Sequence, residues 1–284
     1  MTRIVLTLAA AALAATVARA NAQDRVEDRI RDGAPADTLV IAATTSIEDS
    51  GLFAHILPLF TAKTGIAARV VSRASATALM TAERGTIDLV IVNDPEALDR
   101  FVAAGQGTRR HRIMHNQFVI VGPPSDPAGI KGMTDAAQAL REIARKRATF
   151  VSRGDNSGTH VAELRLWQAA KVNPKARDGK WYRETGLGMG LTDQMAVRLN
   201  GYALTDGATW ARSGSADWIL LDGDPQLFNP YEVIMVNPAN HPHVNIAAAA
   251  AFIDWVTSPE GRDAIGGYRV DGAQLFVPDA GPTN

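Results

Sequence analysis

Short apolar runs and longer segments with helical apolar spacing alternate along most of the chain. Largely apolar runs at 38–42, 67–72 and 87–92 are each followed by hydroxyl or acidic residues and then by a helical segment. A continuous apolar run is typical of a strand buried on both faces, and Thr, Ser or Asp before a helical segment is typical of an N-cap. The alternation predicts an α/β fold with a mostly parallel sheet.

The same alternation continues to the C-terminal end of the sequence. We expect further strands at 117–122, 150–153, 181–184, 202–205, 218–221 and 232–236. We expect helices from 48 through 60, 74–84, 94–104, near 134–147, from 157, near 191–200, after 206, at 246–256 and near 259–266. The tryptophans on the helical apolar faces, among them Trp167, Trp210 and Trp255, are predicted to lie in the core.

Two of these strands divide the chain. The apolar strands 117–122 and 232–236 bracket a self-contained α/β block, as expected where a chain crosses from one lobe to another and returns. We therefore predict one lobe from residues 38–116 plus 235–284 and a second lobe from 117–234, with the ligand in the cleft between them. A single-domain sheet is the alternative interpretation.

The first residues have the pattern of an export signal. Arg3 precedes an alanine-rich apolar run at 4–17, and Ala20-Asn21-Ala22 fits a small-x-small cleavage site. We predict a signal peptide at 1–22, cleaved after Ala22, and a disordered leader at 23–37, which is charged and lacks periodicity. The chain has no cysteine to carry a lipid anchor, and we therefore expect a protein of the periplasm.

Composition then excludes several functions. The apolar content of 46% and charged content of 21% are those of an ordinary globular protein. The net charge of −1 gives no reason to expect a nucleic acid or an acidic membrane surface as a partner. The absence of cysteine excludes disulfides, thiolate metal sites and a cysteine nucleophile.

The stretch 152–160 (Ser-Arg-Gly-Asp-Asn-Ser-Gly-Thr-His) is the strongest candidate binding site. It joins an expected strand to a helix, and the first N–H groups of a helix lack partners and carry partial positive charge. Arg153 precedes this helix start, and Ser157, Gly158 and Thr159 lie within it. All these donors suit an oxyanion, although capping of the helix, with Arg153 paired to Asp155 or Glu163, would also explain them.

Matching groups are expected on the first lobe. Thr44, Thr45 and Ser46 follow a strand and precede a helix, and Ser75 has the same kind of position. The glycine run at 186–190, with Met189 and Gly190 before the next helix, can bring backbone N–H groups to the cleft or act as a flexible connection. Two lobes that present such ends to each other would surround an anion.

Other chemistry is less well supported. Ser157 lacks the G-x-S-x-G pattern of a hydrolase nucleophile, so an exported serine hydrolase is a secondary hypothesis and we expect no enzyme activity. His241-Pro242-His243 is interpreted as a structural loop rather than a metal site because no acidic third ligand lies nearby. We expect neither a metal nor a cofactor.

The motifs together resemble a known family. The segments 150–160 and Thr44-Thr45-Ser46-(x)2-Asp49-Ser50-Gly51-Leu52 closely resemble the periplasmic tungstate-binding proteins of ABC importers, the TupA type. The similarity covers nearly the whole mature chain, and its further segments are 116–131, 184–190, 205–206, 223–225 and 268–274. The chain departs from the family's usual residues at Ala43, Ala74 and Ala76.

The resemblance implies a fold, a ligand and partners. The implied fold is that of a type II periplasmic binding protein, with two α/β lobes joined by a two-strand hinge. The implied function is capture of tungstate, or of molybdate, for a membrane permease and its ATPase, by a monomer. By position, Arg153 would neutralise charge while Ser157, Gly158, Thr159, Thr45, Ser46 and Ser75 would donate hydrogen bonds.

Phosphate or another oxyanion is the alternative ligand. Tungstate and molybdate near neutral pH only accept hydrogen bonds, whereas monohydrogen phosphate also donates one, so a phosphate site gains from a carboxylate acceptor. The sequence leaves open whether Asp49, Asp94 or Asp155 faces the cleft, and it does not separate tungstate from molybdate.

Overall fold

The computed structural model describes residues 38–176 and 180–279, so the predicted signal peptide and leader at 1–37 lie outside the described residues. The first elements are β1 (Leu39–Thr44), α2 (Thr45–Ser50), α3 (Leu52–Thr64), β2 (Ala68–Arg73), α4 (Ser75–Glu83), β3 (Leu89–Val92) and α5 (Pro95–Ala103). The middle elements are β4 (Gly107–Val121), α6 (Ala136–Lys146), β5 (Phe150–Ser152), α7 (Gly158–Ala169), β6 (Tyr182–Glu184), α8 (Met189–Arg198), β7 (Ala203–Asp206), α9 (Gly207–Ser213) and β8 (Ile219–Leu221). The last are β9 (Phe228–Val236), α10 (Ile246–Thr257), α11 (Pro259–Gly267), β10 (Arg269–Val270), β11 (Ala273–Gln274) and β12 (Val277–Pro278).

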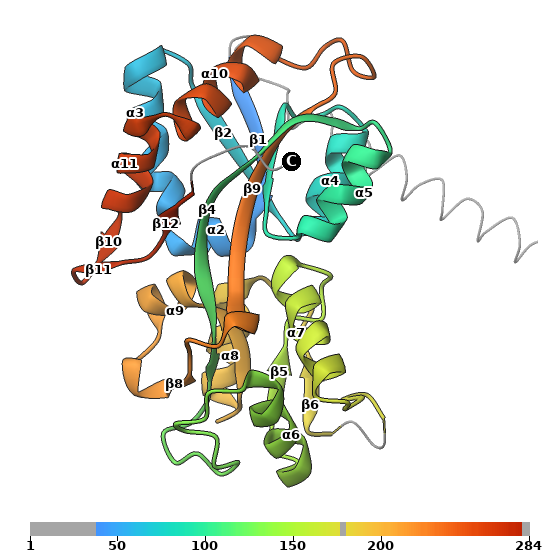
Figure 1. Cartoon of the computed structure of the whole chain (residues 1–284), viewed down its shortest axis with the longest axis vertical. Coiled ribbons are helices and arrows are strands. Elements are labelled where there is room, and N and C mark those ends of the chain that lie inside the picture. The colour runs from blue at the N-terminus through green and yellow to red at the C-terminus, as the bar shows by residue number, and fades with distance from the viewer. Residues whose placement is uncertain (1–37, 177–179, 280–284) are drawn as a thin grey trace, which may run out of the picture.

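Figure 1 shows two lobes connected by the long strands β4 and β9. The upper lobe contains β1 to β3, α2 to α5, α10 and α11, and the lower lobe contains β5 to β8 and α6 to α9. β4 and β9 pair antiparallel from Gly107–Val236 to Gln117–Phe228, and the end of β4 then pairs with β7 and β8 in the lower lobe. This arrangement is the α/β fold of two lobes with a two-strand connection that the sequence predicts. The predicted lobe boundaries themselves stay a prediction, because both strands pass through both lobes.

The sheet is more mixed than predicted. β1 pairs parallel with β2 and β3, and β5 pairs parallel with β6, as expected for strands joined by crossover helices. The prediction of a mostly parallel sheet is nevertheless wrong at the centre, where β9 runs antiparallel to both β3 and β4. The reason is the connection between the lobes, since one strand leaves the upper lobe and the other returns to it.

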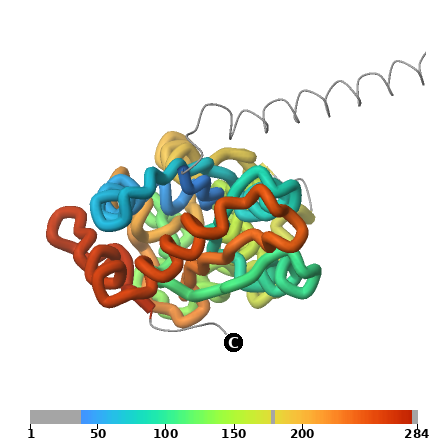
Figure 2. Tube along the Cα trace, turned by 90° about the horizontal axis from the view of Figure 1, so that it is seen from above, coloured from blue at the N-terminus to red at the C-terminus, as the bar shows by residue number. Residues whose placement is uncertain are grey.

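Helices cover the sheet on both sides in the upper lobe. One apolar cluster joins α3, α10 and α11 to one face, and a second joins α4 and α5 to the other. Figure 2, viewed onto the upper lobe, shows α3 and α11 on one side and α4 and α5 on the other. The predicted core tryptophans Trp167, Trp210 and Trp255 are buried. Continuous burial of β1 and β3 follows from this double cover.

Three predicted boundaries are wrong, the first of them the start of β9 at Phe228, ahead of the expected residue 232. The single helix expected through Phe60 is divided at Gly51, whose φ of 80° ends α2 and starts α3 at a new angle. β4 begins at Gly107, ahead of the expected residue 117. The first half of this strand is rich in Arg and His and only half-buried, so it lacks the apolar pattern from which a strand is predicted. Within residues 38–176 and 180–279, no helix has both the length and the hydropathy needed to span a membrane.

Candidate functional site

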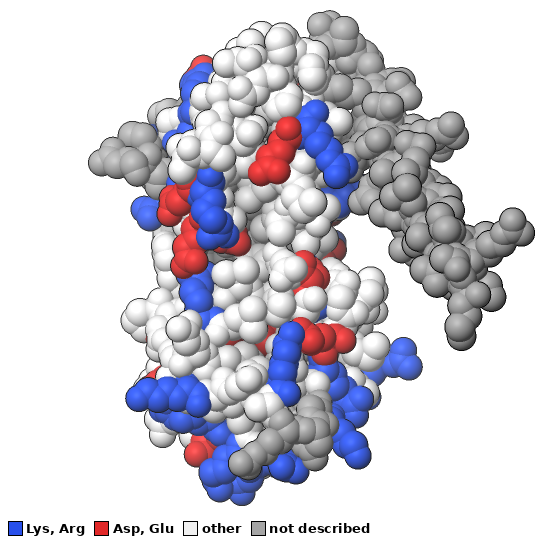
Figure 3. All heavy atoms as spheres, turned by 90° about the vertical axis from the view of Figure 1, so that its right-hand side faces the viewer, with Lys and Arg blue, Asp and Glu red and all other residues white. Residues whose placement is uncertain are grey.

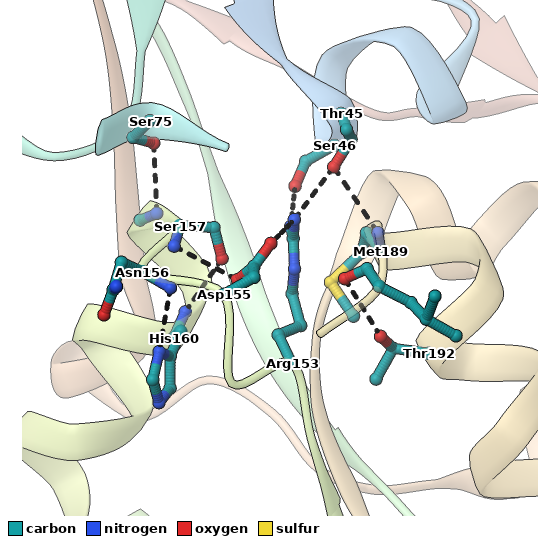
Figure 4. Close-up of polar contacts among 12 residues, drawn as sticks. Thr45, Ser46, Ser75, Arg153, Asp155, Asn156, Ser157, His160, Met189 and Thr192 are labelled. Carbon is teal, nitrogen blue, oxygen red and sulfur yellow. Dashed lines mark hydrogen bonds and ion pairs between the residues drawn. The ribbon is translucent and has the colours of Figure 1, made fainter. Parts of the chain in front are cut away.

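The guanidinium of Arg153 lies between the lobes and is 1% exposed. Arg153 follows β5 in the lower lobe, and its Nη2 donates to Thr45 Oγ1 at 3.0 Å while Nη1 donates to Ser46 Oγ at 3.4 Å. Both acceptors belong to the first residues of α2 in the upper lobe (Figure 4). Nε of Arg153 is buried and has no hydrogen-bond partner in the described part of the chain. A buried cation with a free donor is therefore present where the sequence predicts the anion site.

A carboxylate lies directly on this arginine. Asp155 Oδ2 is 2.5 Å from Arg153 Nη2, and its Oδ1 accepts a hydrogen bond from the backbone N–H of Ser157 at 3.1 Å. The alternative pairing of Arg153 with Glu163 does not occur, because Glu163 accepts from Trp167 and Tyr182 instead. Of the three acids left open by the sequence, Asp155 thus lies in the site and balances the charge of Arg153.

The start of α7 is fixed from within and from the upper lobe. Ser157 Oγ accepts from the N–H of His160 at 3.2 Å, which is an N-cap hydrogen bond. The N–H of Gly158 donates across the lobes to Ser75 Oγ at 3.0 Å. A Cβ at Gly158 would lie 2.2 Å from Asn93 Oδ1, so only glycine allows the two lobes to approach this closely.

The first two N–H groups of α8 donate to the upper lobe. Gly188 is its N-cap and supplies no side-chain hydrogen bond. The N–H of Met189 donates to Thr45 Oγ1 at 3.4 Å, and that of Gly190 donates to Asp49 Oδ2 at 3.0 Å. The glycine run therefore does bring backbone N–H groups to the interface between the lobes, as the sequence suggested. Asp49 is the second acid that faces this interface.

Eight of the ten predicted site residues are joined by these hydrogen bonds: Thr45, Ser46, Ser75, Arg153, Ser157, Gly158, Met189 and Gly190. The other two, Thr44 and Thr159, are buried next to them in sequence, but their hydroxyls have no partner among the described residues. The third open acid, Asp94, accepts from the N–H of Ala97 and caps α5, so it serves that helix instead.

The sequence missed a buried polar network beside the site. Asn229 donates to Asn116 at 2.7 Å and to Asp206 at 2.8 Å, and Tyr231 donates to Asp206 at 2.5 Å. Asn93, beside Gly158, donates to Asn229 at 2.9 Å. Asn93 directly follows β3, and the other residues lie on β4, β9 and the end of β7, where the strands cross between the lobes. The only signal in the sequence is polar residues at the ends of apolar strands, which does not reveal their pairing.

Burial controls the protonation of the groups around the site. Burial raises the pKa of Asp206 above its ordinary value, and that of Asp193 well above it, which favours their neutral forms. Burial lowers the pKa of His160, so the ring is neutral at neutral pH and its Nδ1 accepts from the N–H of Asn156 at 3.1 Å. The hydroxyl of Ser157 accepts from the backbone N–H of His160, and the ring of His160 accepts from Asn156. No histidine base is therefore placed to activate Ser157 as a nucleophile. No group of three or more His, Cys, Asp or Glu residues among those described could hold a metal ion.

Comparison with known proteins first defines the class. A model described as a PBP superfamily domain matches residues 22–260, so the chain belongs to this superfamily of periplasmic binding proteins. Its fold is that of the type II members.

The family within this class is also clear. The tungstate-binding protein TupA of Peptoclostridium acidaminophilum is 38% identical, over 95% of this chain and 94% of that protein. The structure of TupA from Desulfovibrio alaskensis G20 is 42% identical with a TM-score of 0.72, over 87% of this chain and 100% of that one. A structure titled as the tungstate ABC transporter from Geobacter sulfurreducens is 44% identical with a TM-score of 0.75, over 83% and 100%. The chain belongs to the TupA family, as the resemblance predicted, and is a binding protein rather than an enzyme.

Proposed function

We propose that the protein captures tungstate, with molybdate as the alternative ion, at the interface between its lobes. The observation that carries this proposal is the meeting of helix starts around Arg153. Thr45, Ser75, Gly158 and Met189 are the first residues of α2, α4, α7 and α8. Thr45 contacts Met189 and Ser75 contacts Gly158, so each lobe contributes two helix starts to one place. Helix N-termini are suited to anions because their N–H groups and dipoles point at the ligand.

The charge balance of the site favours such a ligand. Asp155 already neutralises Arg153 at 2.5 Å, and Asp49 adds a further carboxylate beside the start of α8, so the site carries no surplus positive charge. A bound dianion is then stabilised by hydrogen-bond donors and helix dipoles, each charged hydrogen bond contributing about 1.5–3 kcal/mol. Several such bonds reach the roughly −12 kcal/mol of nanomolar binding after the costs of desolvation. No metal is required for this affinity.

The choice between tungstate and phosphate depends on Asp155. Its Oδ1 and Oδ2 are both engaged by donors, Ser157 N–H and Arg153 Nη2. A carboxylate whose two oxygens are already engaged by donors offers little to the proton of monohydrogen phosphate, while its repulsion acts equally on all three dianions. We therefore rank tungstate and molybdate, which accept hydrogen bonds only, above phosphate as ligands.

The proposed setting follows from the family. We propose that the mature protein is a periplasmic monomer that delivers its ion to an ABC permease with an ATPase partner. Relatives carry the names tungstate-binding protein and tungstate ABC transporter, which supports this assignment. The predicted signal peptide at 1–22, cleaved after Ala22, would direct the protein to the periplasm.

Isothermal titration with a panel of oxyanions tests the proposal. We expect stoichiometric binding of tungstate and molybdate, and no binding of sulfate or phosphate at comparable concentration. A thermal-shift assay provides an independent readout, since a ligand at 100 times its Kd stabilises the folded state by about 2.7 kcal/mol. Binding of phosphate without binding of either metallate would transfer the assignment to the phosphate alternative.

A further inference from the structure

The far end of the lower lobe carries a basic cavity that the oxyanion site does not use. The cavity has a volume of about 710 Å³ and lies between α6 and the segments 171–176 and 181. Four cationic residues line it: Arg141, Arg145, Arg147 and Lys171. In Figure 1, α6 lies at the bottom of the molecule, on the side of the lower lobe away from the upper one. The cavity is therefore separate from the interface around Arg153.

Part of this positive charge is not paired locally: Arg145 pairs with Glu142 and Arg147 has an interaction of its own, but two lining cations do not. Arg141 and Lys171 are exposed and make no hydrogen bond or ion pair with any described residue, and the same holds for Lys146 beside them. Glu142 is the acid in the lining, and Arg145 neutralises it at 2.5 Å. Arg141 and Lys171 in the lining, with Lys146 next to it on α6, repel one another and gain from an anionic partner.

The positive charge extends beyond the cavity over the whole end of the lobe. Lys180, next to the cavity residue Trp181, and Lys131, in the loop before α6, are also exposed. Of the nearby acids, Glu184 pairs with Lys175, whereas Asp126 and Asp135 accept hydrogen bonds from neutral donors, keep their charge and offset part of the positive charge. Figure 3 shows basic residues gathered at this lower end, whereas both signs are mixed higher on the same face. The whole chain has a net charge of −1, so this end is an exception.

Apolar side chains line the cavity together with the basic groups. Trp181 is half-buried and packs edge-to-face on Trp167, with ring centroids 5.7 Å apart. Ala144 and Val172 line the cavity beside it. A tryptophan among arginines and lysines is the combination found where proteins meet the headgroup layer of a membrane. The planar guanidinium group of arginine can donate two hydrogen bonds to the phosphate of a phospholipid, and the ammonium group of lysine adds charge attraction.

We propose that this basic end, defined by Arg141, Arg145, Lys146, Arg147, Lys171 and Trp181, binds the headgroups of anionic phospholipids at a membrane surface. A free organic phosphate has the same chemistry as a headgroup, but it would engage the cavity alone. The spread of basic residues around the cavity favours an extended anionic surface instead. Binding at this end leaves the interface between the lobes free, and it does not depend on the ion captured there.

Vesicle co-sedimentation of the mature protein tests the proposal. We expect binding to vesicles of phosphatidylglycerol, little binding to vesicles of phosphatidylcholine, and loss of binding as salt is raised. The double variant R141E/K171E should bind phosphatidylglycerol at least about tenfold more weakly. The matched control is R100E/R262E, which makes the same change in net charge on α5 and α11 of the upper lobe.

Each other outcome counts against the proposal. Equal binding to both lipids, or equal loss in R141E/K171E and in the control, would show that the basic end is not the site. Binding of soluble glycerol phosphate without binding of vesicles would assign the cavity to a free phosphate. Thermal unfolding and tungstate titration verify that R141E/K171E is folded. The milder R141Q/K171Q replaces it if it is not.

Discussion

The two helix starts that the lower lobe presents to the upper lobe are built differently. The start of α7 is capped by its own Ser157 and closed by the turn of Asn156, which has a φ of 58° and donates to His160. The start of α8 has no cap of its own, and its first two N–H groups donate to Thr45 and Asp49 of the upper lobe. One start has its own cap and takes one hydrogen bond from the upper lobe, between Gly158 and Ser75, whereas the other has no cap and depends on the upper lobe for its first two N–H groups.

This difference separates two tasks of the site. A self-capped helix keeps its N–H groups in place whether the lobes are apart or together, so α7 is a preorganised part of the site. A helix whose start is satisfied by the opposite lobe gains hydrogen bonds on closure, so α8 contributes to holding the lobes together. Substitutions on the two sides should therefore affect different measured quantities.

The largest expected effect is that of removing the cation shared by both sides. Arg153→Gln leaves Asp155 buried without its partner and removes the donors that reach α2. Truncating one partner of a buried charge pair costs about 4 kcal/mol, so tungstate affinity should fall roughly 1,000-fold in calorimetry. The control is Arg183→Gln, an exposed arginine on β6. A loss of less than tenfold for Arg153→Gln would contradict the central role of this residue.

The next effect concerns α7 alone and is a change in stability with pH. Burial raises the pKa of Glu163 to about 7, so the native state holds its proton more tightly than the unfolded state does. The cost of the buried carboxylate is absent below its unfolded pKa of 4.5, grows as the pH rises from there to about 7, and is complete above about 7. Glu163→Gln removes this cost and should gain about 3 kcal/mol in unfolding free energy at pH 8 relative to acidic pH. Urea denaturation at both pH values measures it.

Tungstate affinity at pH 7 is the second measurement for Glu163→Gln. It should be unchanged, because Glu163 bonds Trp167 and Tyr182 behind the start of α7 and not the groups that face the upper lobe. Parallel pH dependence of wild type and variant would exclude Glu163 as the titrating group.

A smaller effect is expected at the hydroxyl that serves both Arg153 and α8. Thr45→Val removes the acceptor for Arg153 Nη2 and for the N–H of Met189. We expect a loss of about 2 kcal/mol in tungstate binding, or roughly 30-fold, with little change in stability. The comparison is Ser157→Ala, which removes the cap of α7 and should cost about 1 kcal/mol of stability. Equal effects of both variants on stability would remove the distinction between the two helix starts.

The smallest effect is expected at Asp49. Asp49→Asn weakens the acceptor for the N–H of Gly190 and should speed tungstate release by about fivefold, or about 1 kcal/mol, because the closed form loses part of its stabilisation. Glu48→Gln, at the neighbouring exposed acid, should leave release unchanged. Stopped-flow measurement of release distinguishes them, and a slower association with unchanged release would assign Asp49 to ion entry instead.

Much of the fold could be predicted because its signals are local. The strands and helices of the α/β units begin close to the predicted residues, and the hydroxyl and glycine residues at 45, 75, 158 and 188–190 do lie at helix starts. The first half of β4 was missed because its basic residues mask a strand that is only half-buried. Whether a central strand runs parallel or antiparallel depends on where the chain returns, which no local pattern records.

The sequence by itself determined which residues could bind an anion: one arginine before a helix start, hydroxyls at the ends of two strands, and a glycine run before another helix. Only the tertiary structure decided how they meet. The contacts Ser75–Gly158 and Thr45–Met189 join residues 83 and 144 positions apart, and Asp155 turns its carboxylate onto Arg153 rather than onto solvent. Propensities and caps act within one turn of chain, whereas the pairing of two lobes depends on the close approach that Gly158 permits beside Asn93.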